Sequence, residues 1–189
     1  MVEIITNSTM DLVEDKISNN QENRLVENEF HPLNNEWAYW AHLPHDTDWR
    51  VESYKKVLEF DKMEQIIALN EMLPEKLVKN CMLFIMKKGI KPIWEDAKNR
   101  DGGCFSYKIL NKNVFESWKS LTYSLVGESL TKDIRFIKTI NGITISPKKS
   151  FCIIKIWCST NLYQDSHKIV DVKGLSKEGC LFKKHTPEY

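Results

Sequence analysis

Two long segments rich in β-branched residues constrain the fold most. Residues 134–145 and 151–158 are dense in isoleucine, and a short polar stretch around Pro147 separates them. β-Branched side chains pack well on a pleated surface and lose rotamer freedom in a helix. We therefore predict a strand over each segment, so that a β-sheet forms part of the fold.

The rest of the chain alternates between strand-like and helix-like patterns. Apolar and polar residues alternate in the predicted strands, whereas apolar residues recur at helical spacing in the predicted helices. No regular β-α-β order appears, which favours an α+β domain with a mainly antiparallel sheet. The further predicted strands are 36–42, 82–87, 103–110 and 180–182. The predicted helices are 61–72, 113–126 and 161–172. The first helix opens on an Asp61/Glu64 capping-box pattern, and the second ends before Gly127.

The dipeptide Asn141-Gly142 allows two interpretations. Between two strands, Asn-Gly is the commonest signal of a two-residue hairpin turn. Within one long strand, the glycine instead indicates a β-bulge. The residues alone leave both open.

Composition and charge divide the chain into a tail and one domain. Residues 1–30 contain seven acidic residues and two basic ones, a balance of −5. The remaining residues therefore carry about +6, by subtraction from the total of +1. We predict an acidic, solvated or disordered tail at 1–30 and a single domain at 31–189. The basic surplus of the domain is a weak indication of an anionic partner.

Several functional classes are not supported. No apolar run reaches the roughly 18 to 20 residues of a membrane helix, and the start of the chain lacks a secretory signal. Five scattered cysteines form no Cys-x-x-Cys pair, so we expect a reduced, cytoplasmic protein without a zinc site. No nucleophile, metal or phosphate-loop motif appears, so we expect neither an enzyme nor a cofactor. His42 and His45 are interpreted as solvated turn residues.

Six tryptophans are the most informative residues. Trp118 lies on the apolar stripe of a predicted helix, where core packing explains it. Trp49 and Trp94 instead lie in polar, turn-rich segments, where an indole serves as a lid over the core or as a stacking platform. Glu95 follows Trp94 directly and places an acidic acceptor beside an aromatic face.

Four blocks of sequence carry a specific resemblance. They are HPLNNEWAYW at 31–40, GIKPIWEDAKNRDGG at 89–103, LVGES at 125–129 after Trp118, and IKIW ending at Trp157. In content and spacing, the chain resembles the eukaryotic translation initiation factor 4E family, which binds the cap of messenger RNA. The resemblance covers residues 31–189.

The resemblance implies a fold and a cap-base site. The fold would be a curved antiparallel sheet with three helices on its convex face and the cap on its concave face. Trp49 and Trp94 would stack on the 7-methylguanine base, Glu95 would read the base edge, and Trp157 would lie beside the methyl group. The same alignment places Gly142 inside a strand, so the bulge is preferred to the hairpin.

The expected phosphate contacts depart from the family pattern. Lys148 takes the position of the family's leading arginine, while Ser150 and Ile153 take the next basic positions. We expect Lys148 and Lys149 to bind the cap phosphates. Lysine is a point charge without the bidentate fork of arginine, so a weaker or re-routed phosphate grip is expected.

The expected partner surface also departs from the pattern. The family binds the helix of a scaffold protein, initiation factor 4G, on the convex face. His31 and Pro32 are kept there, Ile67 replaces a tryptophan, and Tyr123 lies on the edge of the second helix. Loss of an indole removes a residue type that is enriched at interface hot spots, so we expect either a scaffold of the 4G type or a divergent equivalent.

The resulting functional expectation is a monomeric cap-binding protein in translation initiation, with capped mRNA as its ligand. Two alternatives remain at this point: a cap-sequestering repressor that lacks ordinary scaffold binding, and a general single-strand RNA binder that uses aromatics and lysines. Cap hydrolysis is a further alternative, for which the chain offers no nucleophile.

Overall fold

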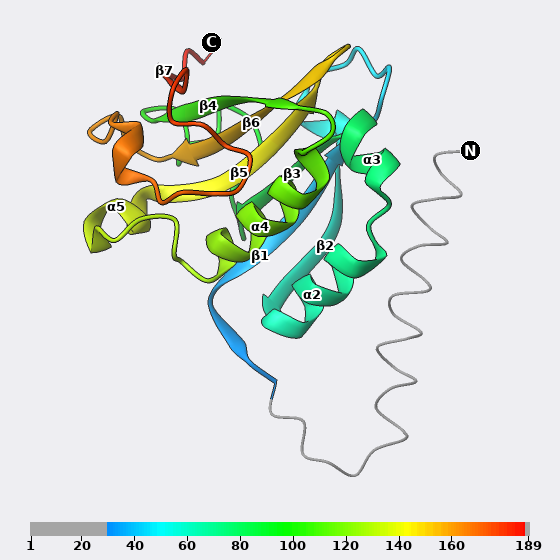
Figure 1. Ribbon diagram of the computed structural model, residues 1–189, viewed down its shortest axis with the longest axis horizontal. Coiled ribbons are helices and arrows are strands. Elements are labelled where there is room, and N and C mark those ends of the chain that lie inside the picture. The colour runs from blue at the N-terminus through cyan, green and yellow to red at the C-terminus, as the bar shows by residue number, and fades with distance from the viewer. Residues whose placement is uncertain (1–29, 188–189) are drawn as a thin grey trace.

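The structure, a computed structural model, describes residues 30–187 (Figure 1). Nearly all of the predicted acidic tail lies outside this range. One antiparallel sheet with the strand order β2-β1-β3-β5-β6-β4-β7 organises the described residues. Its strands are β1 (Pro32–His42), β2 (Tyr54–Lys62), β3 (Met82–Lys87), β4 (Gly103–Leu110), β5 (Ile140–Pro147), β6 (Phe151–Cys158) and β7 (Leu181–Lys184). The helices are α2 (Met63–Met72), α3 (Glu75–Asn80), α4 (Val114–Val126) and α5 (Ile134–Thr139), with short 3-10 turns at Val51–Ser53 and Ser166–Lys168. The predicted fold class, a curved α+β sheet with helices on one face, is confirmed.

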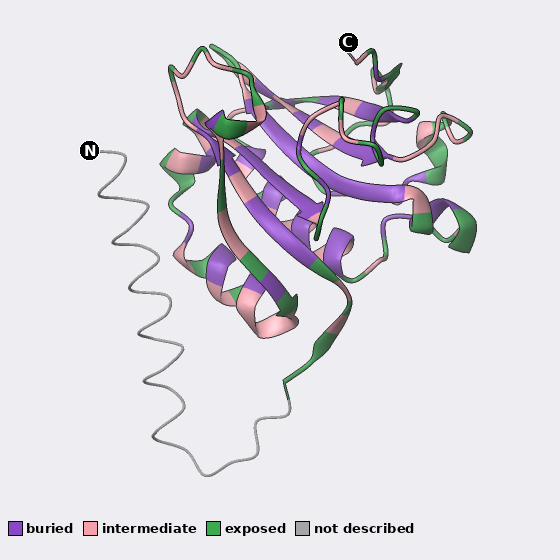
Figure 2. Cartoon of the chain, turned by 180° about the vertical axis from the view of Figure 1, so that it is seen from behind, coloured by how far each residue is buried: buried purple, intermediate pink, exposed green. Residues whose placement is uncertain are grey.

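The sheet separates two apolar clusters, because successive side chains of a strand point to opposite faces. In β1, Trp37 and Tyr39 join the larger core, whereas Trp40 packs into the smaller cluster. Helix α4 contacts β1 and β5 and buries Trp118 completely. Figure 1 shows α2, α3 and α4 on one face of the sheet, and Figure 2 shows the opposite face from behind, without a covering helix. The smaller cluster lies on this helix-free face.

The bulge interpretation of Asn141-Gly142 is confirmed, and the hairpin is excluded. The pairing of β5 with β6 shifts register between Ile140 and Gly142, inside one continuous strand. Gly142 also lies against β3: a Cβ atom added there would stand 2.2 Å from the carbonyl oxygen of Ile85. Only glycine fits at such a close backbone approach.

The predicted strand 134–145 is wrong in its first half. Residues 134–139 form α5, and the Asp133 carboxylate accepts hydrogen bonds from the backbone N–H of Arg135 (2.9 Å) and of Phe136 (3.2 Å). This cap satisfies N–H groups that the helix start would otherwise leave unpaired. Phe136 and Ile137 are buried against the core. Their burial and the Asp133 helix N-cap outweigh the β-propensity of these residues.

The predicted helix 161–172 is also wrong. This segment contains only the 3-10 turn at 166–168, and the rest is irregular. Its side chains are nevertheless held by the core, since Ile169 and Val172 are buried and Tyr163 stacks on Phe136 at 4.6 Å. The apolar spacing therefore reflected anchoring contacts of a loop and not a helix face.

The start of the first predicted helix differs from the expected capping box. Helix α2 begins at Met63, and the side-chain oxygen of Gln65 accepts from the backbone N–H of Asp61 and Lys62. Glu64 instead pairs with the His31 ring at 2.7 Å. After Pro74 the chain forms α3, which was not predicted. The strands 82–87, 103–110 and 151–158 match their predictions, β1 begins earlier than predicted, and β7 is displaced by one residue at its start.

Candidate functional site

The helix-free face of the sheet carries an aromatic cluster. Its buried members are Phe84, Met86, Ile90 and Trp157, and Trp40, Tyr54, Met82 and Trp94 pack against them. Trp157 is fixed in orientation, because its indole N–H donates to the hydroxyl of Thr144 on the neighbouring strand at 2.7 Å. Trp94 is half-buried, so part of its ring remains accessible. The face therefore offers an ordered aromatic floor next to an open indole.

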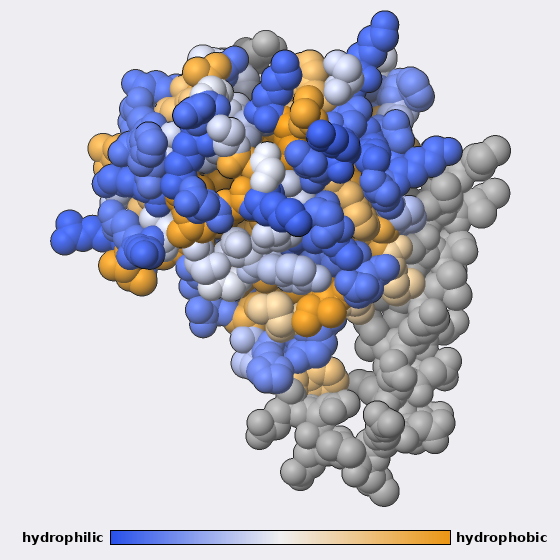
Figure 3. Space-filling view, in the orientation of Figure 1, coloured by the Kyte–Doolittle hydropathy of each residue, from blue (hydrophilic) through white to orange (hydrophobic). Residues whose placement is uncertain are grey.

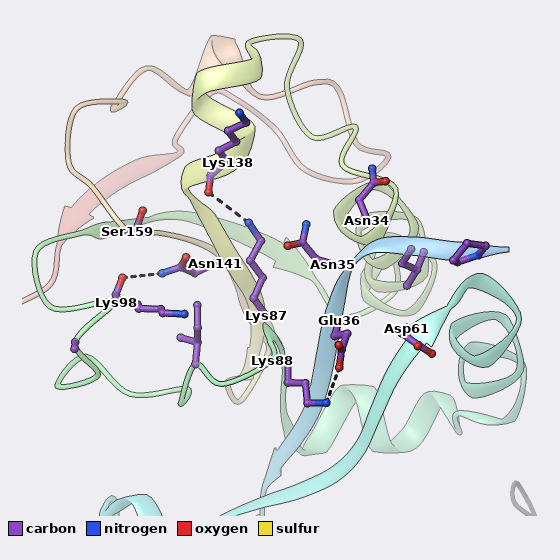
Figure 4. Close-up of a pocket in the computed structure, with 14 residues that line it drawn as sticks. Asn34, Asn35, Glu36, Asp61, Lys87, Lys88, Lys98, Lys138, Asn141 and Ser159 are labelled. Carbon is purple, nitrogen blue, oxygen red and sulfur yellow. Dashed lines mark hydrogen bonds and ion pairs between the residues drawn. The ribbon is translucent and has the colours of Figure 1, made fainter.

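The loop between β3 and β4, residues 88–102, holds Trp94 and Glu95 through buried amides. Asn99 is fully buried, and its side-chain N–H groups donate to the carbonyls of Lys91 and Ile93, each at 2.9 Å. Asn141 of the β5 bulge donates to the side-chain oxygen of Asn99 at 2.9 Å and to the carbonyl of Lys98 at 2.8 Å. Figure 4 shows the second of these bonds. The sheet thereby supports the loop from below.

Polar groups within the same loop fix its remaining turns. The Asp96 carboxylate accepts from the backbone N–H groups of Lys91 and Lys98, both at 2.9 Å. The Arg100 guanidinium donates to the carbonyl of Glu95 at 2.9 Å. Because these bonds close the loop on either side of Trp94, the indole and the neighbouring carboxylate are presented on a pre-shaped support.

Replacement of Asn141 by alanine tests this support. The change removes two hydrogen bonds and leaves the buried side-chain oxygen of Asn99 unpaired, which costs about 1–3 kcal/mol of folding free energy. Thermal and urea denaturation should show this loss. Asn161→Ala is the matched control, since the side chain of Asn161 has no hydrogen-bond partner within residues 30–187. Equal stabilities of the two variants would contradict the supporting role of Asn141.

Trp49 lies on the opposite side of the face, in the loop between β1 and β2. Its indole is 58% exposed and stacks on the buried His42 ring, with centroids 4.4 Å apart and an interplanar angle of 3°. The Nε2 atom of His42 donates to the carbonyl of Asp48 at 2.8 Å, which fixes the ring beneath the indole. A paired hydrogen bond to Arg50 lowers the pKa of Asp48 to about 2, so this carboxylate stays ionised at neutral pH. One face of Trp49 is thus supported, and the indole is presented to solvent.

Tyr54 connects the Trp49 side with Glu95. Its ring meets His42 edge-on at 5.0 Å and Phe84 at 5.4 Å. Burial raises the pKa of the Tyr54 phenol, and the nearby Glu95 carboxylate raises it further. Glu95 is exposed on its loop and close enough to Tyr54 for this repulsion. No ring contact joins Trp49 to Trp94 in the described part of the chain, so the two indoles do not stack on each other.

His185 belongs to this site but was missed in the sequence. It follows β7, is 6% exposed, and stacks on Trp94 with centroids 5.6 Å apart and planes 15° apart. It also lies 4.9 Å from the ring of Trp157. Its Nδ1 atom donates to the carbonyl of Asn99 at 2.7 Å. No local motif surrounds His185, so only the pairing of β7 with β4 could have placed it here.

The predicted phosphate residues lie apart from the aromatic floor. Lys148 and Lys149 are exposed at the turn between β5 and β6, which closes with a hydrogen bond from the Lys148 N–H to the carbonyl of Phe151 at 2.8 Å. Trp157 lies near the other end of β6. The structure therefore brings Trp94, Glu95, Trp157 and His185 together and places the two lysines at a distance along the strand.

The predicted partner residues lie on the helix-bearing face. His31 and Pro32 are exposed beside α2, Ile67 is 44% exposed on α2, and Tyr123 is half-buried on α4. Figure 3 shows apolar surface among polar side chains over α2. Lys119 of α4 forms an ion pair with Glu71 of α2 at 3.1 Å, which places a charged pair across the two helices. Helices α2 and α4 thus form one mixed surface.

A groove of about 900 Å³ lies beside the Trp94 loop, between the start of β1 and the end of β3. Figure 4 shows Lys87, Lys98 and Lys138 around it, and the amine of Lys87 donates to the carbonyl of Lys138 at 3.4 Å. Lys88 is paired with Glu36 at 2.5 Å. The groove shares Lys98 and Asn141 with the support of the loop, but neither Trp49 nor Trp94 lines it.

Three further observations concern metal binding, the cysteines and membrane-spanning helices. Among residues 30–187, no cluster of three or more histidine, cysteine, aspartate or glutamate side chains could hold a metal ion. All five cysteines are free thiols. None of the described helices is both long and apolar enough to cross a membrane.

Comparison with known proteins places the chain in a family. The family profile described as eukaryotic initiation factor 4E matches residues 32–186. A eukaryotic translation initiation factor 4E homolog of Acanthamoeba polyphaga mimivirus is 47% identical over 63 residues, covering 33% of this chain and 23% of that protein. Eukaryotic translation initiation factor 4E of Eremothecium gossypii is 28% identical over 159 residues, covering 81% of this chain and 70% of that protein.

A solved structure agrees with this result. The complex of C. elegans eIF4E-3 with the 4E-binding protein Mextli and cap analog is 25% identical, covers 69% of this chain and 75% of that chain, and has a TM-score of 0.63. The profile match extends over well more than half of the sequence and includes every strand of the sheet. The chain belongs to the eukaryotic initiation factor 4E family.

Proposed function

We propose that this protein binds the 7-methylguanosine cap of messenger RNA and acts in translation initiation in the cytoplasm. The observation that carries the proposal is the helix-free face, where a supported indole at Trp94, an adjacent carboxylate at Glu95 and the buried indole of Trp157 meet. Family membership and the cap analog in the C. elegans complex support it.

The proposed mechanism is recognition of a cationic base by two indoles. Methylation at the seventh position leaves guanine positively charged, and a cation over an indole face gains about 2 kcal/mol or more when desolvated. In the proposed arrangement Trp49 and Trp94 stack on the two faces of the base, and Trp157 lies beside the methyl group. The site is then closed on both sides by rings that His42 and His185 support.

Glu95 supplies the selectivity for the base edge in this proposal. An ionised carboxylate accepts two hydrogen bonds from the Watson–Crick edge of guanine, and each charge-assisted bond contributes roughly 1.5–3 kcal/mol. The loop bonds of Asp96 and Arg100 fix the backbone around this carboxylate. Because recognition needs only stacking, charge and hydrogen bonding, the protein acts by binding and not by catalysis.

Two further sets of residues complete the proposal. Lys148 and Lys149, exposed at the turn between β5 and β6, contact the more distant cap phosphates. A scaffold protein of the initiation factor 4G type, or a divergent equivalent, docks on the helix-bearing face at His31, Pro32, Ile67 and Tyr123. The 4E-binding protein in the C. elegans complex supports such a partner.

Competition between 7-methyl-GTP and GTP tests the function. Titration of the full chain by tryptophan fluorescence should give at least about tenfold tighter binding of 7-methyl-GTP, because GTP stacks without the cation–π term. Equal affinities would reject cap recognition and favour the general single-strand RNA binder. Tryptophan quenching that is absent for both ligands would reject both interpretations.

A further inference from the structure

Lys155 lies on the helix-free face inside the aromatic site. On β6 it alternates with the core residues Ile154 and Ile156, so it shares a face with Trp157. It is half-buried, and its amine stands 5.7 Å from the centroid of the Trp94 ring. A cation is thus built into the floor beside the indole that is proposed to stack on the base.

Lys183 adds a second positive charge on the same face. In the sheet register, Lys183 of β7 and Trp157 of β6 both lie opposite Cys104 of β4, while Lys155 lies opposite Ser106. Burial raises the pKa of the Cys104 thiol, and the positive charges of both lysines lower it, in keeping with their positions around Cys104 in the register. Neither lysine forms an ion pair with any residue that the structure describes.

His185 contributes a buried acceptor next to these charges. Its Nδ1 atom donates to the carbonyl of Asn99, so the neutral ring carries its lone pair on Nε2. Burial lowers the pKa of His185, and the nearby charge of Lys155 lowers it further, which favours this neutral form. The Nε2 atom is buried without a hydrogen-bond partner within residues 30–187. A buried acceptor of this kind is costly unless a ligand supplies a donor.

Two amines and one acceptor on the same face of the sheet match the polar half of a ribonucleotide. Phosphate oxygens accept from ammonium groups, and a ribose hydroxyl donates to a neutral imidazole nitrogen. We propose that Lys155, Lys183 and His185 form a subsite for the ribose and the first phosphates of the bound cap nucleotide. This inference rests on the proposed function and assigns the inner phosphates to the sheet floor instead of the β5–β6 turn.

The test compares ligands with and without phosphates. Lys155→Met keeps the aliphatic stem and removes the charge, so binding of 7-methyl-GTP should weaken about fivefold, as for a partly exposed ion pair. Binding of the 7-methylguanosine nucleoside should stay within about twofold, because the nucleoside has no phosphate for Lys155 to bind and keeps its stacking, base-edge and ribose contacts. Lys132→Met, an exposed lysine on the loop before α5, is the charge-matched control and should leave both affinities unchanged.

A charge relocation and a ribose probe complete the experiment. Ile153 shares the face of Lys155 on β6, so Ile153→Lys combined with Lys155→Met should restore part of the 7-methyl-GTP affinity. A nucleoside that lacks the ribose hydroxyls should bind the wild type more weakly than 7-methylguanosine, and this difference should disappear in His185→Phe. Thermal melting shows whether each variant is folded.

The outcomes separate this inference from the function. Unchanged 7-methyl-GTP affinity in folded Lys155→Met, or an equal loss for nucleotide and nucleoside, would overturn the subsite while leaving cap binding in place. A wild-type protein that binds neither ligand would overturn the proposed function and the subsite together.

Discussion

Trp94→Ala should lower the affinity for 7-methyl-GTP by about a hundredfold or more. Base–aromatic stacking contributes about 1–3 kcal/mol and the cation–π term about 2 kcal/mol, so loss of one indole face removes about 3 kcal/mol or more. The loop that holds Trp94 is supported by Asn99 and Asn141, which the substitution does not touch. Isothermal titration calorimetry with 7-methyl-GTP and GTP measures the effect.

The conservative variant separates stacking from folding. Trp94→Phe retains a ring on which the base and His185 can stack, so its affinity should fall between those of the wild type and Trp94→Ala. Trp49→Ala should weaken 7-methyl-GTP binding to a similar extent, and its stability should change little because Trp49 is 58% exposed. A Trp94→Ala variant that is folded and still binds with wild-type affinity would remove Trp94 from the site.

Glu95→Gln should weaken 7-methyl-GTP binding about tenfold or more. The amide can accept one hydrogen bond from the base edge, but it loses the charge assistance that makes a carboxylate bond roughly twice as strong as a neutral one. The amide also loses the Coulomb attraction of Glu95 to the positively charged base. Fluorescence titration of both proteins at one ionic strength gives the ratio.

A ligand change shows whether this loss arises at the base edge. 7-Methylinosine triphosphate lacks the exocyclic amine that donates to the carboxylate, so the wild type should bind it more weakly than 7-methyl-GTP. Glu95→Gln should discriminate less between the two ligands, as expected for a coupled pair in a double-mutant cycle. Glu116→Gln, an exposed acid at the start of α4, controls for the net charge and should behave as the wild type. Undiminished discrimination by Glu95→Gln would show that another group reads the edge.

The placement of charge in this protein differs from the expectation based on family positions. Serine and isoleucine stand at Ser150 and Ile153, where basic residues were expected, and Lys148 and Lys149 lie at an exposed turn. The structure supplies Lys155 and Lys183 on the sheet floor instead. A phosphate held there would lie close to Trp94 and His185, so the affinity for short cap analogues would depend on the sheet more than on the turn.

Local patterns were sufficient for the parts of the fold and site that depend on near neighbours in the chain. The strands 82–87, 103–110 and 151–158 alternate because one of their faces meets the core, and helix α4 shows its apolar stripe for the same reason. The adjacency of Trp94 and Glu95 on a polar loop, and the six tryptophans, are likewise visible in the sequence. These features indicated the fold class, and the family resemblance then implied the base-binding candidates.

Only the tertiary structure decided the rest, because the decisive contacts join residues far apart in the chain. Residues 134–139 form α5 because the Asp133 side chain caps the start of the helix and because Phe136 is buried, although these residues favour a strand. His185 reached Trp94 through the pairing of β7 with β4, and Lys155 faces the site because of the register of β6. Such proximity leaves no periodic trace in the sequence, so Trp94 and Glu95 could be proposed from the chain, whereas the placement of Lys155 and His185 and the support by Asn141 could not.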